Sequence, residues 1–199
     1  MKTNDKHTRI LVLTALMTAL VLICTLLLRI PCGPDCYIHL GDAAIFLAVM
    51  ILPRKHACFA GSVGASLADL IGGFAFWAPW TFFVKLLMVL VFGAFLDKVN
   101  KHNIKVDTNH ASISDTATEN KKIAGLPRGE FIGLVLACIV AVAGYFVSEM
   151  ILFGQWVGAL ACVGFNTVQV AVDAVVAELV SRTLYTSTIR DIMNYRRPQ

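Results

Sequence analysis

Three ionisable residues lie inside apolar stretches of this 199-residue chain, and their chemistry needs an explanation. Asp42, Asp69 and Lys85 all fall between residues 37 and 85, a stretch that is otherwise mostly apolar. A charged side chain at the centre of a bilayer costs about 2.5 to 3.5 kcal/mol on insertion scales. These residues must therefore pair with one another, contact water or bind a ligand. We expect the stretch to form half of a polar pocket.

Lys85 lies about one turn into an apolar run, and its ammonium group has two possible orientations. The methylene stem could carry the ammonium group outward to the membrane surface. The ammonium group could also point inward and pair with Asp42 or Asp69 across a helical bundle. The inward orientation is favoured. Asp42 has a simpler explanation as well, because a carboxylate in the first turn of a helix stabilises the positive end of the helix dipole.

A second set of polar residues falls in two later apolar runs. Tyr145 and Glu149 are four positions apart, so they share one face of a helix. Asn166, Gln169 and Asp173 follow at steps of three and four and also share a face. Amide and carboxylate groups that point in one direction provide donors and acceptors for a polar heterocycle. Hydrogen bonds between helices would also explain them.

Aromatic and imidazole groups flank these sets at the expected outer membrane face. Tyr37 and His39 precede the apolar run that contains Asp42, and Trp77 and Trp80 bracket a proline in a later turn. These side chains could line the mouth of a pocket, with the tryptophans as an aromatic lid. Tyr and Trp also gather at membrane interfaces without any ligand, so both interpretations stay open.

The composition places these residues in a membrane protein. The chain is 57% hydrophobic and 15% charged, and its mean hydropathy is +0.72, which leaves too little polar surface for a soluble domain of this size. We predict an all-α integral membrane protein of the cell membrane, a single membrane domain over residues 1–199 with six transmembrane helices. The candidate spans are about 8–29, 40–53, 56–73, 79–98, 129–153 and 156–185.

The second and third spans are shorter than the roughly 20 residues that cross a bilayer. Pro53, followed by Arg54 and Lys55, indicates a break between them, because proline cannot donate the amide that a continuing helix requires. A single long helix over residues 40–73 is the competing interpretation.

The basic residues indicate the orientation of the chain. With both termini in the cytoplasm, every Lys and Arg except Arg29 and Lys85 lies on the cytoplasmic side. Cytoplasmic segments of membrane proteins carry an excess of these residues, so the distribution favours six spans with both ends inside. It also explains the net charge of +4 without a nucleic-acid partner.

Small residues indicate where helices approach one another. Gly61 and Gly64 belong to a run of small side chains that ends at Asp69, so close packing there should turn Asp69 toward protein or ligand. Ala15 and Ala19 form a second small face on the first helix. That face could pack within the chain or dock a partner protein.

Residues 99–128 are polar and mixed in charge, and we predict a flexible cytoplasmic linker there. Cys32 and Cys36 could form a disulfide, share a metal ion or be two incidental thiols. No metal site or cofactor is expected. An enzyme is not expected either, because no nucleophile and base, and no trio of metal ligands, recur at one depth.

Several of these segments together resemble the S components, the substrate-binding subunits, of energy-coupling factor (ECF) vitamin transporters. The resemblance rests on the small-residue helix ending in ADLIGG, on YIHLGDAAIFLA, WAPWTFFVK and GYFVSEMILFG, and on the N-x-x-Q spacing of Asn166 and Gln169. It is nearest to the class that includes riboflavin and hydroxymethylpyrimidine binders. The loop with Cys32 and Cys36 and the long linker depart from the family.

The resemblance implies a subunit that binds a water-soluble vitamin or precursor with a heteroaromatic ring, such as hydroxymethylpyrimidine, a pyridoxine-like ring or riboflavin. The small face at Ala15 and Ala19 would dock onto a transmembrane T component, which two cytoplasmic ATPase subunits drive. The contacts implied most directly are Trp77, Lys85, Glu149, Asn166 and Gln169, and Tyr37, His39, Asp42, Asp69 and Tyr145 complete the expected site.

Transport against a gradient would need an outside energy source. The chain has no G-x-x-x-x-G-K-[ST] phosphate-binding loop, so energy would come from a partner or from an ion gradient. The alternative function is therefore a stand-alone ion-coupled secondary transporter in which Asp69, Lys85 and Asp173 relay protons or sodium ions.

Overall fold

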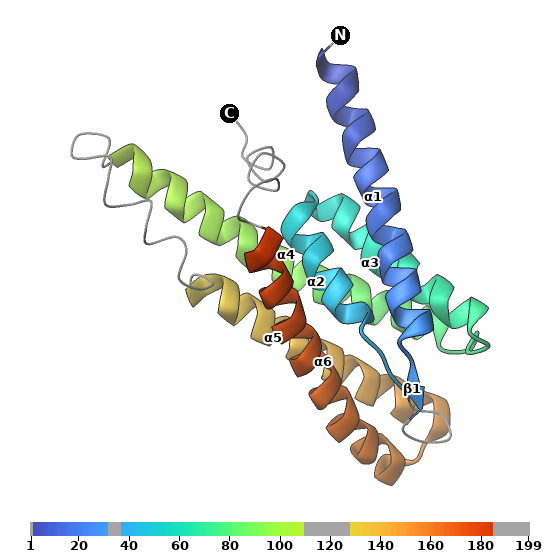
Figure 1. The fold of residues 1–199 in the computed structure, drawn as a ribbon. Helices are drawn as coiled ribbons and strands as arrows, with labels where there is room; N and C mark the ends of the chain where they lie inside the picture. The colour runs from blue at the N-terminus through green and yellow to red at the C-terminus, as the bar shows by residue number, and fades with distance from the viewer. Residues whose placement is uncertain (1, 32–36, 110–127, 185–199) are drawn as a thin grey trace.

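The computed structural model describes residues 2–31, 37–109 and 128–184, which form six helices and a two-stranded ribbon (Figure 1). The strands β1 (Ile30–Pro31) and β2 (Tyr37–Ile38) pair antiparallel between the first two helices. The predicted helical bundle is confirmed, with the ribbon as an addition. The helices are α1 (Lys2–Leu27), α2 (Gly41–Ile51), α3 (Arg54–Ile71), α4 (Ala78–Asn109), α5 (Arg128–Phe153) and α6 (Trp156–Leu184).

Four helices in the described part of the chain are long and apolar enough to cross a bilayer. They cover His7–Leu27, Ala78–Lys98, Glu130–Phe153 and Trp156–Ser181. Helix α2 is apolar but has only 11 residues, so at about 1.5 Å per residue it extends over about half of a 30 Å hydrocarbon core. The chain is therefore a multi-pass membrane protein, while the full count of six spans and the cytoplasmic position of both termini stay predictions.

Helices α2 and α3 are separate, so the single helix over residues 40–73 is wrong. Leu52 ends α2 with an extended backbone, and Pro53 caps the start of α3. Proline pushes the residue before it out of the helical conformation, which explains the break at this position.

Helix α2 forms the centre of the bundle. Every residue from Gly41 to Met50 is buried, and the helix contacts α1, α3, α4 and α6. A helix that is apolar on all sides is stabilised when it is buried on all sides. Its Phe46 packs edge-on against Phe92 of α4, with ring centroids 5.7 Å apart. This core fixes the relative positions of the helices around it.

Helix α1 packs closely against α3, as the small residues of α3 predicted. A methyl group at Gly64 would lie 2.9 Å from the Thr18 carbonyl oxygen and 3.0 Å from Cβ of Val21. Only a hydrogen fits in that space. The hydroxyl group of Thr18 donates to the Thr14 carbonyl oxygen of its own helix at 2.7 Å, so it needs no partner on α3.

The segment predicted as a flexible linker begins as helix. Helix α4 continues to Asn109, which corrects the prediction over residues 99–109. No glycine or proline interrupts residues 94–124, so nothing in the sequence stops the helix where its apolar part ends. Residues 110–127, together with Cys32 and Cys36, lie outside the described residues, and the single-domain organisation stays a prediction.

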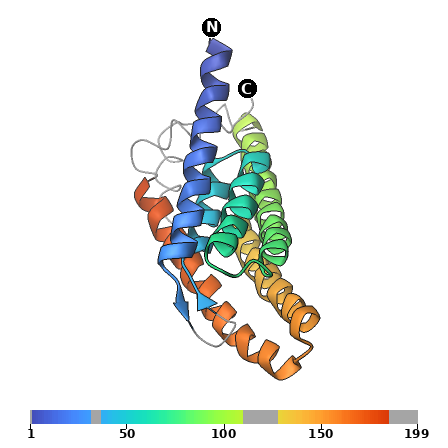
Figure 2. The same ribbon diagram turned by 90° about the vertical axis from the view of Figure 1, so that its right-hand side faces the viewer.

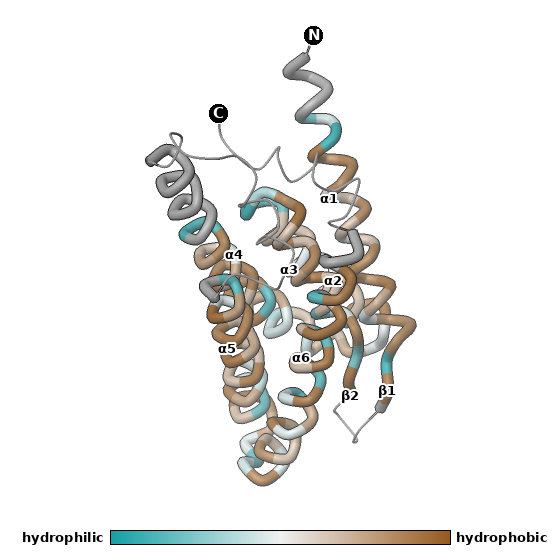
Figure 3. The backbone as a smooth tube through the Cα atoms, turned by 60° about the vertical axis from the view of Figure 1, so that its left-hand side comes forward, coloured by the Kyte–Doolittle hydropathy of each residue, from teal (hydrophilic) through white to brown (hydrophobic). Residues whose placement is uncertain are grey.

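The connections gather at two ends of the bundle (Figure 2). The β1–β2 ribbon, the α3–α4 turn and the α5–α6 turn lie toward one end, and the start of α1 and the α2–α3 junction lie toward the other. Hydrophobic residues dominate the long helices, and polar residues interrupt them along α6 and at the ribbon (Figure 3). The first of these ends is called the ribbon end below.

Candidate functional site

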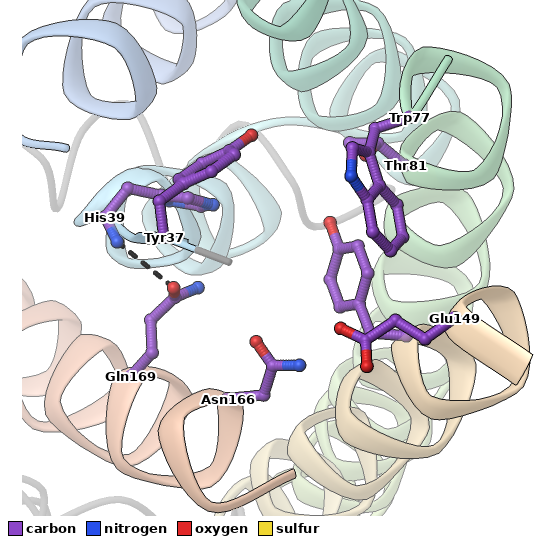
Figure 4. A pocket seen from close by; sticks show the side chains of 8 residues that line it. Tyr37, His39, Trp77, Thr81, Glu149, Asn166 and Gln169 are labelled. Atoms are coloured by element: carbon purple, nitrogen blue, oxygen red, sulfur yellow. Dashed lines mark hydrogen bonds between the residues drawn. The ribbon is translucent and has the colours of Figure 1, made fainter. Parts of the chain in front are cut away.

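A pocket lies at the ribbon end of the bundle, and four parts of the chain supply its lining (Figure 4). It encloses about 390 Å³ of empty space, including the open solvent at its mouth. The lining residues are Tyr37 and His39 from β2 and the residues after it, Trp77 and Thr81 from the α3–α4 turn and α4, Tyr145 and Glu149 from α5, and Asn166 and Gln169 from α6.

Thr81 is the lining residue that the sequence prediction missed. It is a neutral residue with one hydroxyl group, and it attracts no attention in an apolar run. Its spacing gave a usable signal, because Trp77, Thr81 and Lys85 follow one another at steps of four and so share one face of α4.

Trp77 gives the pocket wall a buried donor. Its side chain is only 5% exposed, and its indole Nε1 has no hydrogen-bond partner among the described residues. An unpaired buried donor costs about 1 to 3 kcal/mol, so this group indicates an acceptor atom that a ligand would supply. Trp77 lines the pocket rather than standing exposed at a membrane interface.

Glu149 and Asn166 form another part of the pocket wall (Figure 4). Glu149 is buried, with 7% of its surface exposed, and Asn166 is half-buried. A carboxylate accepts hydrogen bonds only, whereas an amide both donates and accepts. This wall therefore suits a ligand edge that carries donor groups.

His39 is held in its neutral form. The Gly41 backbone N–H donates to its Nδ1 at 2.9 Å, so that nitrogen carries a lone pair. Burial lowers the pKa of His39 to about 4, against the opposing effect of the Asp42 carboxylate. The backbone N–H of His39 donates to Oε1 of Gln169 at 3.1 Å (Figure 4). This contact joins the segment after β2 to α6 at one edge of the pocket.

Asp42 and Lys85 form a buried ion pair directly behind the lining. The Lys85 Nζ lies 2.6 Å and 2.9 Å from the two Asp42 carboxylate oxygens, and both side chains are fully buried. The inward orientation of Lys85 is confirmed. Gln169 donates to Asp42 at 3.3 Å, and the Lys85 Nζ lies 4.7 Å from the centre of the Tyr145 ring. The pair therefore supports two lining residues from behind.

Asp69 supports a third lining residue. Its carboxylate accepts a hydrogen bond from the Tyr37 hydroxyl. Burial, and next the nearby Asp69 carboxylate, raise the pKa of Tyr37, so the hydroxyl keeps its proton and acts as a donor. Asp42, Asp69 and Lys85 lie behind the lining residues and are not part of the lining. Their direct contact with a ligand stays a prediction.

The remaining sequence-predicted residues lie away from the pocket. Asp173 is fully buried on α6 and is not part of the lining. Ala15 and Ala19 are exposed on α1. In the part of the chain that the structure describes, no cluster of three or more His, Cys, Asp or Glu side chains could hold a metal ion.

The lining as a whole can bind a ligand but has no arrangement that indicates bond-breaking chemistry. Flat aromatic surfaces come from Tyr37, Trp77 and Tyr145. The polar groups supply the Trp77 N–H, which has no partner among the described residues, and acceptors at Glu149 and Asn166. Such a mixture suits a flat heteroaromatic ring with both kinds of group.

Sequence comparison finds relatives over most of the chain. A family model described as the S component of ECF-type riboflavin transporters matches residues 5–186. The chain is 27% identical over 180 residues to the thiamine precursor transporter HmpT of Lactococcus lactis subsp. cremoris (strain MG1363), with 89% of each chain covered. It is 29% identical over 157 residues to an uncharacterized protein of Pyrococcus woesei, over 78% of this chain and 87% of that protein.

Proposed function

This chain belongs to the family of ECF-type riboflavin transporter S components, and we propose that it captures a small heteroaromatic vitamin precursor for an ATP-driven importer. The family resemblance seen in the sequence is confirmed, as is the multi-pass membrane location. The family is a class of transporter subunits and not a class of enzymes.

The arrangement of donors and acceptors around the pocket carries the ligand proposal. Trp77 offers an N–H that has no partner among the described residues, Glu149 offers a carboxylate, and Asn166 offers both a donor and an acceptor. A ligand that bonds to all three residues needs both acceptor atoms and an amino group on its ring. An aminopyrimidine with a hydroxymethyl group meets these requirements.

A similar protein supports a single-ring ligand over the three rings of riboflavin. HmpT is a thiamine precursor transporter, and hydroxymethylpyrimidine, a precursor of that kind, has a single ring. We therefore rank hydroxymethylpyrimidine before a pyridoxine-like ring, and both before riboflavin.

The energy for uptake would come from partner subunits. The chain has no phosphate-binding loop of its own, and S components of the ECF class work with a membrane T component and two ATPase subunits. Ala15 and Ala19 present a small, exposed surface on α1. Small residues allow a partner helix to approach closely within the bilayer, so this face is the proposed docking site.

The alternative of an ion relay gains no support from the geometry. Lys85 is paired with Asp42, whereas Asp69 is bonded to Tyr37. Two of the three residues proposed for the relay therefore have separate partners. Uptake by the purified protein alone in liposomes, abolished by an uncoupler, would support the relay and contradict the ECF proposal.

Binding measurements on the purified, detergent-solubilised protein test the proposed ligand. Hydroxymethylpyrimidine, pyridoxine and riboflavin are each titrated against the protein and against Asn166→Ala. We expect saturable binding of hydroxymethylpyrimidine and about tenfold weaker binding by the variant, which corresponds to about 1.4 kcal/mol. Thr167→Ala is the matched control, because Thr167 is exposed on the same helix. Unchanged affinity in Asn166→Ala would remove Asn166 from the site.

A further inference from the structure

Arg29 belongs to a compact cluster beside the pocket that the proposed binding function does not explain. Its guanidinium carbon lies 4.0 Å from the centre of the Tyr37 ring and 4.9 Å from the centre of the Phe74 ring. Its Nη2 lies 3.9 Å from the Asp69 carboxylate. The Arg29 side chain is only 13% exposed. A charged group so far from water is held by specific contacts.

The cluster joins two connections that are far apart in the sequence. Arg29 and Tyr37 belong to the connection between α1 and α2, whereas Asp69 and Phe74 belong to the end of α3 and the turn after it. The Tyr37 and Phe74 rings also contact each other, with centroids 5.0 Å apart. Each of these two connections contributes lining to the pocket, through Tyr37 on one side and Trp77 on the other.

The chemistry of arginine suits this position. A guanidinium group is planar, stays charged, stacks on aromatic faces and sheds water more easily than an ammonium group. Arg29 can therefore lie on the Tyr37 ring while its charge is balanced by Asp69. The Tyr37 hydroxyl bonds to the same carboxylate. Ring and hydroxyl of Tyr37 are thus both held by the Arg29–Asp69 pair.

We propose that Arg29 is a positioning residue for ligand binding, which stacks on Tyr37 and, with Asp69, fastens the ribbon to the α3–α4 turn over the pocket. Arg29 does not line the pocket, so it acts through Tyr37. The fastening holds the lining closed around a bound ligand and has to open before the ligand leaves. Its main effect is therefore on the rate of ligand release.

The first test needs no ligand, so it decides the fastening even if the proposed function is wrong. Hydrogen exchange is measured at the backbone amide of His39, which bonds to Gln169 of α6 at the edge of the pocket at 3.1 Å. In Arg29→Gln we expect about tenfold faster exchange at this amide. In Arg29→Lys, which keeps the charge but loses the planar stacking, the increase should be smaller.

The control variant is Arg54→Gln. Arg54 also forms an ion pair, through an Nε to Asp97 distance of 2.9 Å, but it lies at the start of α3 and Asp69 lies near its end. Exchange at His39 should not change in this variant. Equal exchange rates at His39 in the parent protein, Arg29→Gln and Arg54→Gln would overturn the proposal. A shared fall in thermal stability without faster local exchange would show a structural role only, and it would overturn the proposal as well.

The second test rests on the proposed function and uses radiolabelled hydroxymethylpyrimidine. We expect Arg29→Gln to release it about tenfold faster, with an association rate changed by less than threefold. Tyr37→Phe keeps the stacking ring but loses the bond to Asp69, so its release rate should lie between those of the parent and Arg29→Gln. If the parent protein binds no hydroxymethylpyrimidine, the ligand proposal fails while the exchange result still stands. Binding with unchanged release in Arg29→Gln would overturn the positioning role.

Discussion

Trp77 supplies the pocket with a buried hydrogen-bond donor, because its indole N–H has no partner among the described residues. We predict that Trp77→Phe, which keeps an aromatic ring and removes the donor, weakens ligand binding by about five- to tenfold, or about 1 to 1.4 kcal/mol. Thermal stability should stay the same or rise, since an unpaired donor is removed.

Trp156→Phe is the matched control for this substitution. Trp156 is 62% exposed at the start of α6, and its replacement should leave ligand affinity unchanged. Isothermal titration of both variants gives the comparison. Equal affinity in Trp77→Phe and the parent protein would show that the ligand does not use this N–H group.

His39 makes the fold sensitive to mild acid. The pKa of His39 is about 4 in the folded protein, whereas an ordinary histidine has a pKa of about 6.5. Between pH 6.5 and 4, His39 is therefore mostly protonated in the unfolded chain and mostly neutral in the folded chain. The contribution of His39 to stability is therefore complete above pH 6.5 and is lost as the pH falls from 6.5 to 4, by up to about 3 kcal/mol.

We predict that His39→Asn, whose side-chain oxygen can still accept from the Gly41 N–H, loses part of the parent protein's pH dependence in this range. The measurement is the unfolding temperature in detergent at intervals between pH 4.5 and 7.5. Asp42, Lys85 and Arg29 also act on His39 and remain in both proteins, so the difference isolates the imidazole. Identical pH profiles for the two proteins would contradict the neutral buried histidine.

Residue spacing was enough to predict most of the residues that line the pocket, but it could not show which charged residues pair with each other. Tyr145 with Glu149, and Asn166 with Gln169, share helix faces, and each pair meets at the pocket. Spacing along one helix says nothing about the helix opposite. Whether Lys85 pairs with Asp42 or Asp69 therefore depends on tertiary packing, which only the structure shows.

At the scale of the helix, the contact between α1 and α3 depends on the absence of a side chain at Gly64. We predict that Gly64→Ala destabilises the protein by about 1 to 3 kcal/mol, because the added methyl group would press on the Thr18 carbonyl and on Val21. Gly164→Ala on α6 meets no atom within 4 Å and should stabilise its helix by about 0.5 to 1 kcal/mol.

The two glycine substitutions should therefore shift the unfolding temperature in opposite directions: Gly64→Ala should lower it and Gly164→Ala should raise it. Both add one methyl group to the interior of a helix, so helix propensity alone would give them the same sign. A stabilising effect of Gly64→Ala would mean that α1 and α3 are farther apart than described.

The exposed small face of α1 makes a separate prediction about assembly. Ala15→Leu and Ala19→Leu add bulk at positions that are exposed among the described residues and lie outside the pocket lining, so ligand affinity should not change. Co-purification with the T component and the ATPase subunits should be lost. Ala171→Leu, the same change at an exposed position on α6, should preserve both. Equal loss of ligand binding and assembly in the α1 variants would count against a docking face.

Hydropathy was sufficient to find the helices but not to assign their surroundings. Pro53 ended one helix and began the next, and its effect is readable from local sterics. Helix α2 has the same apolar character as a membrane-exposed helix, yet it is enclosed by protein on all sides. Burial in lipid and burial in protein select the same residue types. The sequence therefore could not show whether α2 is surrounded by lipid or by protein.

At the scale of the whole molecule, the fold provides a binding site and leaves energy supply to other subunits. Alone in liposomes, the protein should not accumulate hydroxymethylpyrimidine. With the T component and both ATPase subunits, uptake should require ATP. A tracer uptake assay with and without an uncoupler checks this result, and uncoupler-sensitive uptake by the protein alone would contradict it.

The central claim is that side chains from four parts of the chain converge to hold one small heteroaromatic ring. Native mass spectrometry of the detergent-purified protein, loaded in turn with hydroxymethylpyrimidine, pyridoxine and riboflavin, tests it most directly. We predict one bound hydroxymethylpyrimidine per chain, with occupancy reduced in Asn166→Ala and retained in Thr167→Ala. A protein that retains none of the three compounds, or that binds them equally well when Asn166 is replaced, would contradict the claim.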